Sequence, residues 1–258
     1  MNITDFNMSY FSLKGKNAIV TGGNTGLGQA FSLALAKAGA NIFMASIEPD
    51  DPKHNKLIED EGGKAVYMYA NMTKPGVPKQ IVEKCVETLG SVDILVNCAG
   101  ICICKPVLEF DRAEWDPMIA INLTGAFEMS HEVAKYMIPQ RSGKIINICS
   151  LFSFLGGQWS PAYAASKHGI AGLTKAYCDE LAQYNIQVNG IAPGYFQTKA
   201  AANSTSDPER FKWIADHTAE GRWGEIHDLM GTTVFLASNA SQFVNGHILA
   251  VDGGFLVR

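Results

Sequence analysis

Residues 16–28 read KNAIVTGGNTGLG, and this stretch decides the fold. Its first part, residues 16–21, is short, apolar and rich in β-branched side chains, which is typical of a buried strand. Glycines crowd residues 22–28, and an amphipathic run from 26 to about 38 predicts a helix that ends at Gly39. A glycine turn between a strand and a helix N-terminus is suited to bind phosphate, because the backbone can approach closely and the first N–H groups of the helix are free.

The same alternation of short apolar runs and longer amphipathic runs continues along the chain. Further strands are expected at residues 40–46, 65–70, 93–97, 143–149, 186–191 and 246–251. Further helices are expected at residues 53–61, 78–89, 114–138 (broken by Pro139), 162–184 and 225–237. Strands separated by such helices pair in parallel, and strands apolar on both faces are covered from both sides. The sequence therefore predicts an α/β fold, a single Rossmann-type, doubly wound, seven-stranded parallel sheet in three αβα layers.

Length and composition narrow the class of protein. The chain has 258 residues, which suits one domain spanning residues 1–258. A net charge of −4 gives no basic excess to bind a nucleic acid or an anionic membrane, so neither partner is expected. No run reaches the roughly 18 apolar residues of a membrane helix, and the N-terminal stretch lacks the pattern of a signal peptide. We therefore expect a cytoplasmic protein.

The six cysteines do not predict a disulfide framework in a chain of this length. Cys98, Cys102 and Cys104 lie close together, which raises the question of a metal site. Their spacing fits no common zinc pattern, and no further cysteine or histidine pair completes a tetrahedral set. We expect reduced thiols and no metal.

Polar residues fall where the carboxyl ends of several expected strands meet, at the edge where doubly wound sheets bind ligands. NCAG at residues 97–100 follows the fourth strand, Ser150 ends the fifth, and PG at residues 193–194 follows the sixth. Tyr163 and Lys167 are four residues apart and share one face of a helix. Taken alone, such a pair is typical of an ordinary helix surface, but Ser150 at the same edge favours a catalytic interpretation.

These residue types suit the oxidation of an alcohol, which removes a hydride from carbon and a proton from oxygen. The protein must accept the proton. At the usual tyrosine pKa of about 10, only about 0.1% is phenolate at pH 7, so a useful base needs a lower pKa. The cation of Lys167 is expected to lower the pKa of Tyr163.

With these motifs, the chain resembles the short-chain dehydrogenase/reductase superfamily along essentially its whole length. The glycine spacing G-x-x-x-G-x-G, the N-x-A-G and the Y-x-x-x-K are similar to the motifs of that superfamily. The resemblance implies a nicotinamide-dependent oxidoreductase with the catalytic residues Asn122, Ser150, Tyr163 and Lys167. Ser150 would then hold the substrate oxygen near Tyr163, and Asn122 would help to hold a water that relays the proton from Lys167. The alternative for Asn122, a poor helix former, is a hydrogen bond to its own helix.

The same resemblance assigns a cofactor site and an assembly. The cofactor residues would be Gly22, Asn24, Thr25, Gly26, Leu27, Gly28, Ser46, Asn71, Met72, Asn97, Ala99, Gly100, Tyr163, Lys167, Pro193, Gly194, Phe196 and Thr198. The loop from Pro193 to Thr198 would hold the nicotinamide carboxamide. The assembly would be a homotetramer in which the helices around 114–138 and 162–184 pair between subunits.

The end of the second strand predicts which nicotinamide cofactor binds. An acidic residue there holds the ribose 2′-hydroxyl of NAD, whereas a nearby arginine accommodates the 2′-phosphate of NADP. Here Ser46 replaces the acid, and no arginine or lysine lies beside it or in the glycine turn. Glu48 would repel a phosphate if it points inward. The sequence favours NAD over NADP, with the Asn71 amide placed to reach the adenine.

The second half resembles a narrower group, the sugar-acid dehydrogenases of the gluconate 5-dehydrogenase and 2-dehydro-3-deoxy-D-gluconate 5-dehydrogenase type. Residues 146–150, 186–196 and 221–224 carry this resemblance. It implies hydride transfer between the cofactor and a secondary alcohol or ketone of a sugar acid or related polyol. That group tends to have two arginines where this chain has Ile103 and Cys104, which cannot grip a carboxylate in two places.

The missing arginines leave the substrate open between a sugar acid, a neutral sugar, a polyol and a modified acid. Charges for a carboxylate remain available from Lys105, Lys199, Arg210 and Arg222. Candidate substrate residues are Ser150, Phe152, Trp159 and Gly194. Aromatic residues such as Phe152 and Trp159 are, however, more often part of a core. The long polar stretch at about 194–224 is interpreted as a lid over the substrate.

Two other functions remain. A 3-ketoacyl-carrier reductase of the same superfamily usually has a basic patch for its acidic carrier protein and an NADP signature. Neither is clear in the sequence. A non-catalytic dinucleotide-sensing protein would be expected to have lost Ser150, Tyr163 or Lys167, and all three are present.

Overall fold

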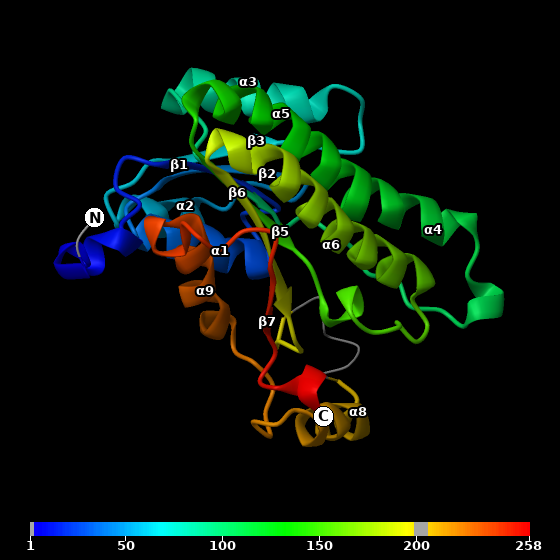
Figure 1. Ribbon diagram of the computed structural model, residues 1–258. Helices are drawn as coiled ribbons and strands as arrows, with labels where there is room; N and C mark the ends of the chain where they lie inside the picture. The colour runs from blue at the N-terminus through cyan, green and yellow to red at the C-terminus, as the bar shows by residue number, and fades with distance from the viewer. Residues whose placement is uncertain (1–2, 199–205) are drawn as a thin grey trace.

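The computed structural model describes residues 3–198 and 206–258, and its centre is a parallel sheet of seven strands (Figure 1). The strands are β1 Asn17–Thr21, β2 Asn41–Ser46, β3 Ala65–Tyr69, β4 Ile94–Asn97, β5 Gly143–Ile148, β6 Ile186–Pro193 and β7 Ile248–Val251. Six lie inside the stretches expected from the sequence, and β6 continues two residues further, to Pro193. The predicted α/β fold with a doubly wound parallel sheet is confirmed.

The strand order β3-β2-β1-β4-β5-β6-β7 places a switch point next to the glycine turn. β1 pairs with β2, with Thr21 opposite Ala45, and also with β4, with Val20 opposite Val96. The chain therefore leaves β1 and β4 in opposite directions. Such a reversal opens a crevice outside the carboxyl ends of the two central strands, where doubly wound sheets bind ligands.

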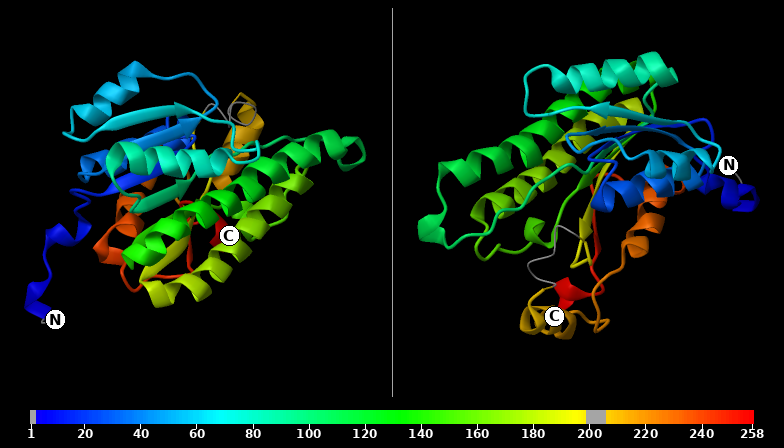
Figure 2. Two further views of the ribbon diagram at one scale, coloured as in Figure 1. Left: turned by 90° about the horizontal axis from the view of Figure 1, so that it is seen from above. Right: turned by 180° about the vertical axis from the view of Figure 1, so that it is seen from behind.

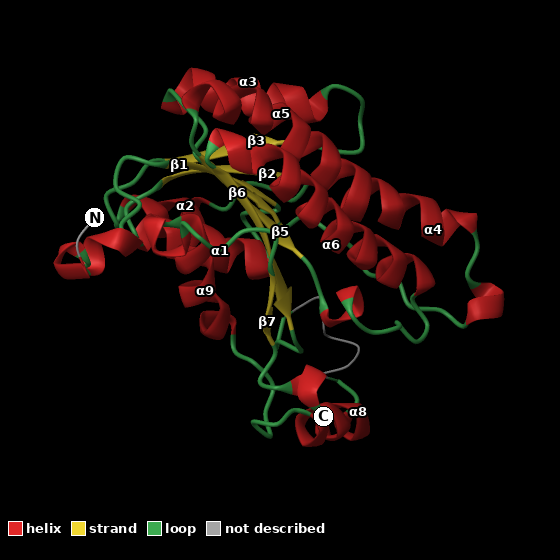
Figure 3. Ribbon diagram, in the orientation of Figure 1, coloured by secondary structure: helices red, strands yellow, loops and turns green. Residues whose placement is uncertain are grey.

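Helices cover both faces of the sheet (Figures 2 and 3). On one face lie α1 Gly26–Lys37, α2 Pro52–Glu59 and α9 Met230–Ala237. On the other lie α3 Val77–Leu89, α5 Ala126–Gln140 and α6 Pro161–Leu181. The helices bury one core on each face, because neighbouring strand residues point to opposite sides. Val20 and Met44 lie in one core with Phe31, whereas Ile19 and Phe43 lie in the other.

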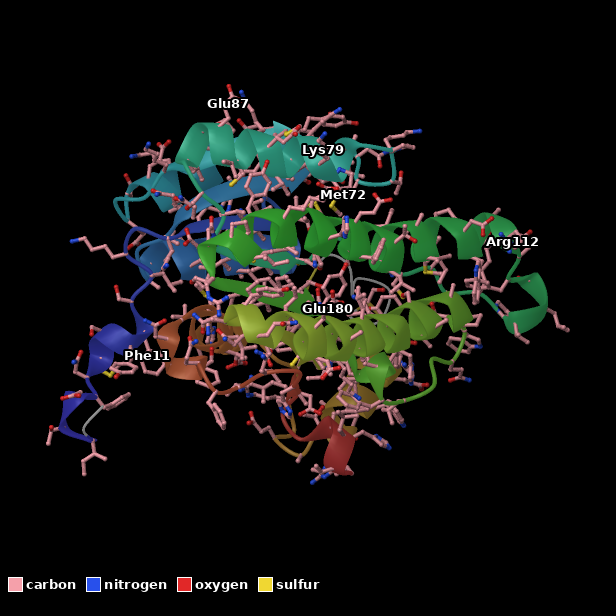
Figure 4. All side chains as sticks on the ribbon, turned by 45° about the horizontal axis from the view of Figure 1, so that its top comes forward. Phe11, Met72, Lys79, Glu87, Arg112 and Glu180 are labelled. Atoms are coloured by element: carbon pink, nitrogen blue, oxygen red, sulfur yellow. The ribbon has the colours of Figure 1, made fainter. Side chains whose placement is uncertain are left out.

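The long helical region predicted at 114–138 is a composite rod. It begins with α4 Arg112–Ile119, passes through a π-helical turn, Ala120–Gly125, and continues as α5. Figure 4 labels Arg112 at the outer end of this rod. The predicted break at Pro139 is wrong, since α5 runs to Gln140 and ends at Arg141 with a φ of 50°. Pro139 lies in the last turn, where the lost N–H removes only one helical hydrogen bond.

The stretch at 194–224, interpreted from the sequence as a polar lid, contains the helix α8 Pro208–His217, which was not among the expected helices. The Asp207 carboxylate caps it by accepting hydrogen bonds from the backbone N–H groups of Glu209 and Arg210. Figure 1 shows α8 beside the C-terminal turn, beyond the end of β7. Residues 199–205, and with them Lys199, lie outside the described part of the chain.

Within the described ranges, no helix has the length and apolar character that crossing a membrane requires.

Candidate active site

The glycine turn after β1 is too tight for larger residues. A Cβ added to Gly28 would lie 2.1 Å from the carbonyl oxygen of Gly22. Gly22 and Gly26 have φ values of 65° and 52°, which favour glycine. The local sequence thus forces the chain into a close turn that ends directly at α1.

The N-terminus of α1 fits a dinucleotide pyrophosphate. Thr25 is its N-cap, and the Thr25 side chain accepts no hydrogen bond from the first N–H groups of the helix. These donors therefore face outward at the positive end of the helix dipole. A bound nicotinamide dinucleotide would supply hydride acceptance or donation, while the turn and α1 would hold its phosphates.

A cleft of about 350 Å³ lies at this edge of the sheet and joins the glycine turn to Tyr163 and Lys167, whereas the other two predicted catalytic residues, Asn122 and Ser150, are not part of its lining. Its walls come from the glycine turn, the ends of β2 and β3, the loop after β4 and the helix α6. The predicted residues that line it are Gly22, Thr25, Gly26, Leu27, Gly28, Ser46, Asn71, Met72, Ala99, Gly100, Tyr163 and Lys167. Residues that the sequence did not assign to the catalytic or cofactor site also line it, among them Ile101, Cys102, Ile121 and Ile148.

Two predicted cofactor residues do not line this cleft, and their side chains form hydrogen bonds inside the protein. Asn97 is buried and donates hydrogen bonds to Asn147 (2.8 Å) and Ser130 (3.0 Å). Asn24 is also buried and donates to the backbone oxygens of Glu48 (3.3 Å) and Pro49 (2.6 Å). The Asn24 bonds fasten the glycine turn to the loop after β2.

The loop after β6 lies outside the wall of the cleft. A Cβ on Gly194 would meet the backbone of Asp252 at 2.6 Å. Phe196 is buried, and its ring lies where a Cβ on Gly224 would be, at 2.5 Å. Pro193 ends β6, and Thr198 is the last residue described before the gap. These packed contacts fix the start of the loop.

Tyr163 and Lys167 lie together on α6. The Lys167 ammonium is 5.5 Å from the centre of the Tyr163 ring and donates a hydrogen bond of 2.6 Å to the Ile148 backbone oxygen. This bond ties the lysine to the end of β5. Burial lowers the pKa of Lys167 from its ordinary value.

Burial raises the pKa of Tyr163, and the hydrogen bond with the Ser150 hydroxyl acts in the opposite direction. The sequence led us to expect that Lys167 lowers the pKa of Tyr163. In the protein without cofactor, burial has the larger effect and raises this pKa. The positive charge of an oxidised nicotinamide would favour the phenolate further. Phe152 packs edge-on against the Tyr163 ring, with the ring centres 5.9 Å apart.

Ser150 is held at the start of a 3-10 turn, Leu151–Ser153, which follows β5. Its Oγ accepts a hydrogen bond from the Phe152 N–H at 3.2 Å. The neighbouring Ser153 hydroxyl donates to the Lys167 backbone oxygen at 2.7 Å. The turn and α6 are thus joined, so that Ser150 faces Tyr163.

Asn122 lies in the π-helical turn, and its side chain does not bond its own helix. The amide accepts a hydrogen bond from the Ile101 N–H and donates one to the Ile101 oxygen, both at 2.9 Å. It also donates to the Ser166 hydroxyl at 3.2 Å. Asn122 therefore fixes the loop after β4 against α6, and the alternative of a bond within its helix is wrong.

The loop after β4 carries two neighbouring thiols, of which Cys102 lines the cleft. The sulfur atoms of Cys102 and Cys104 are 3.9 Å apart, and Cys102 lies 3.7 Å from the Ser160 hydroxyl. Over residues 3–198 and 206–258, no three His, Cys, Asp or Glu side chains are grouped to hold a metal. Trp159, whose backbone oxygen accepts a hydrogen bond from the Lys105 N–H of the same loop, has a φ of 65° and is 55% exposed, so it does not belong to the core.

The fold, the glycine turn and the Ser150–Tyr163–Lys167 cluster agree with the family comparison. Residues 16–209 match the family described as short chain dehydrogenase. The chain belongs to this family, and it is a nicotinamide-dependent oxidoreductase that acts on CH–OH groups.

Its relatives include sugar-acid enzymes. The chain is 61% identical to an uncharacterised oxidoreductase, YgcW, of Escherichia coli (strain K12), covering 100% of this chain and 98% of that protein. It is 45% identical to the 2-dehydro-3-deoxy-D-gluconate 5-dehydrogenase of Bacillus subtilis (strain 168), covering 96% and 97%. A crystal structure of gluconate 5-dehydrogenase from Burkholderia cenocepacia J2315, in complex with NADP and tartrate, aligns with a TM-score of 0.91 at 37% identity, covering 97% and 98%.

Proposed function

We propose that this protein interconverts a secondary alcohol and a ketone on a sugar acid of the gluconate or 2-dehydro-3-deoxygluconate type. The observation that carries the proposal is the cleft that joins the glycine turn to Tyr163 and Lys167, with Ser150 hydrogen-bonded to Tyr163. The names of the relatives support the substrate class. A related polyol is the alternative substrate, because Ile103 and Cys104 stand where the sugar-acid enzymes tend to have arginines.

In the proposed mechanism, Ser150 donates a hydrogen bond to the substrate oxygen and holds it beside Tyr163. The Tyr163 phenolate accepts the hydroxyl proton during oxidation, and the phenol returns it during reduction. Lys167 lies on α6 and is hydrogen-bonded to the end of β5, and from there its positive charge stabilises the phenolate. Asn122 orders the loop after β4, which forms one wall of the cleft. The π-helical turn that contains Asn122 would help to hold a water that relays the proton.

We propose NAD as the preferred cofactor. Ser46 and Glu48 line the cleft at the end of β2, and Glu48 is the only charged side chain that the described lining has there. The lining includes one cation, Lys167, which is bound at β5, three strands away in the sheet order. A 2′-phosphate would therefore meet a carboxylate and no positive partner. The NADP in the Burkholderia structure belongs to that enzyme.

We propose that the chain is a single domain, residues 1–258, acting as a homotetramer in the cytoplasm. An open groove lined by small and apolar residues lies between α5 and α6. Because these two helices leave the groove exposed, it offers a surface on which another subunit can pack, and this supports the assembly. Its lining is Leu123, Thr124, Phe127, Gly169, Gly172, Leu173 and Ala176. The cytoplasmic location rests on the sequence, whose six cysteines form no disulfide framework. The segment 194–224 would close over the substrate with α8.

A substrate panel tests the proposal. The wild-type protein is assayed for production or loss of reduced nicotinamide with 5-ketogluconate, gluconate, 2-dehydro-3-deoxygluconate, common polyols and a 3-ketoacyl thioester, each with NAD(H) and with NADP(H). We expect turnover of a sugar acid and a higher kcat/KM with NAD(H). Turnover of the thioester alone would favour an acyl reductase. Tight dinucleotide binding without turnover of any compound would favour a sensor.

A further inference from the structure

The loop after β4 carries a pair of thiols that the proposed mechanism does not use. The sulfur atoms of Cys102 and Cys104 are 3.9 Å apart. Cys102 lines the cleft together with Tyr163, whereas the described lining of the cleft does not include Cys104. Both cysteines are exposed, so a small molecule in solution can reach them without unfolding the protein. One thiol of the pair therefore belongs to the wall of the cleft, and its neighbour is open to solvent.

The two thiols lie on one side of a loop that is fastened at every second residue. Side chains two positions apart point to the same side of an extended chain, and the short distance between the sulfur atoms shows that these two do. The backbone hydrogen bonds that fasten the loop join Ile101 to the Asn122 amide, Ile103 to the Ser160 hydroxyl and Lys105 to the Trp159 oxygen. The ammonium of Lys105 also forms an ion pair with Glu114. The thiols are thus held close together by contacts that involve neither sulfur atom.

This arrangement can accommodate a disulfide bond. The Cα atoms of bonded cysteines are about 4.4–6.8 Å apart, and residues two positions apart can span at most about 7 Å. No distant segment therefore has to move to bring the Cα atoms of Cys102 and Cys104 into range. The side chains must move, because the sulfur atoms have to approach from 3.9 Å to about 2.0 Å.

Formation of this bond would disturb the wall of the cleft. The sulfur of Cys102 is 3.7 Å from the Ser160 hydroxyl, which donates a hydrogen bond of 2.7 Å to the Ile103 oxygen. The N–H of Ile103 contacts the Met118 sulfur at 3.4 Å. Ile103 lies between the two cysteines, so drawing their sulfur atoms together would turn its peptide groups and weaken these contacts. The glycine turn belongs to β1 and α1 and would keep its geometry.

We propose that Cys102 and Cys104 are a site of reversible oxidation, at which a peroxide converts the two thiols to a disulfide and thereby slows substrate turnover. The Cys104 sulfur attacks a peroxide oxygen, the O–O bond breaks, and water leaves, which gives a sulfenic acid. The Cys102 sulfur then attacks the Cys104 sulfur, and the sulfenic hydroxyl leaves as a second water with the Cys102 proton. The two thiols lose two electrons, which the peroxide gains. Two small thiols reverse the step by exchange and leave as their own disulfide.

The surroundings of Cys102 assign the first attack to Cys104. Desolvation raises the pKa of Cys102 to about 11, and the neighbouring Cys104 thiol adds to the rise. Cys102 is therefore almost entirely a thiol at neutral pH, and the thiolate is the form that attacks an oxidant. Disulfides in cytoplasmic proteins are typically transient and redox-sensing, as this one would be. The effect on turnover rests on the proposed function, whereas formation of the disulfide does not.

Oxidation of the wild-type protein by hydrogen peroxide tests the inference. Catalase removes the excess peroxide, and the remaining free thiols are alkylated before proteolysis. Mass spectrometry should find a peptide that has lost one pair of hydrogen atoms and carries no alkyl group at Cys102 and Cys104. The kcat/KM for the best substrate should fall about tenfold, as expected for the loss of one or two hydrogen bonds. Dinucleotide affinity should stay within about twofold, and dithiothreitol should restore kcat/KM.

Two serine variants locate the effect. Cys104→Ser should have wild-type activity before treatment, because Cys104 is outside the described lining of the cleft, and should keep this activity after treatment. Cys178→Ser is the matched control, since it removes a half-buried cysteine from α6 and leaves the pair intact. It should remain as sensitive to peroxide as the wild type.

Three results would overturn the inference. They are a wild type without the disulfide, a disulfide that joins Cys98 instead, and an equal loss of activity in treated Cys104→Ser. A disulfide between Cys102 and Cys104 that leaves kcat/KM unchanged would equally contradict it, because the effect on turnover would be missing. A wild type that turns over no sugar acid overturns the proposed function, and the mass measurement, which needs no substrate, still decides on the disulfide.

Discussion

Two buried lysines in this protein have different surroundings. Lys167 donates a short hydrogen bond to the Ile148 oxygen and stands beside Tyr163, where its charge has a chemical use. Lys144, at the start of β5, is only 7% exposed. Its contacts are the Ser241 hydroxyl at 3.5 Å and the Gln242 side-chain oxygen at 3.4 Å. Lys144 thus buries a charge with weak compensation.

Lys144→Met should stabilise the protein at neutral pH. Burial lowers the pKa of Lys144 from 10.5 to about 8, so the unfolded state binds more protons between these values. The wild-type stability should therefore rise with pH in this window, as the native lysine becomes neutral. A difference of about 2.5 pKa units corresponds to about 3 kcal/mol, which sets the upper size of the gain below pH 8.

Urea denaturation at pH 7 and at pH 9.5 measures this effect. The advantage of Lys144→Met should shrink at the higher pH, because the wild type no longer buries a charge there. A variant that is less stable than the wild type at pH 7 would show that the lysine is compensated in a way that these contacts do not reveal.

At the scale of elements, the glycine turn is the feature on which cofactor binding depends. Gly28→Ala should abolish dinucleotide binding, because its Cβ would lie 2.1 Å from the Gly22 oxygen and would push the turn away from α1. Equilibrium binding of NADH by fluorescence measures the loss.

Gly231→Ala, in α9, is the control. Its Cβ would meet nothing within 4 Å, so it should bind normally and gain about 0.5–1 kcal/mol of stability. Normal binding by Gly28→Ala would refute this account of the turn.

The elements that local sequence determines were the predictable ones. β1 and α1 were predicted within one residue, because β-branched runs, glycines and amphipathic spacing are local signals. The π-helical turn at Ala120–Gly125 was not predicted, since it accompanies the contacts of Asn122 with Ile101 and Ser166, far away in sequence. The helix α8 was missed although Asp207, Pro208 and Glu209 are a typical helix start.

The site was predictable to the extent that family motifs mark it. Tyr163, Lys167 and the glycine turn lie in one cleft as expected. The hydrogen bonds of Asn24 and Asn97 inside the protein depend on tertiary packing and needed the structure.

At the scale of the whole molecule, the groove between α5 and α6 predicts the assembly. Phe127 is 47% exposed beside Leu173 and the two helical glycines. Phe127→Glu should convert the proposed tetramer to smaller species, because it places a charge in an apolar contact. Light scattering after gel filtration measures the mass. Leu57→Glu, at a site that is 50% exposed on α2, is the control and should stay tetrameric. A monomeric wild type would contradict the proposed assembly.

The central claim is that this short-chain dehydrogenase uses Tyr163 to move the substrate proton. The most direct measurement is the rate of nicotinamide reduction by Tyr163→Phe, with the best wild-type alcohol and with dinucleotide affinity measured on the same sample. We expect a loss of kcat on the order of 10²–10⁴-fold with unchanged dinucleotide affinity, because the ring packing remains and only the proton acceptor is removed. A Tyr163→Phe variant with the wild-type kcat would contradict it.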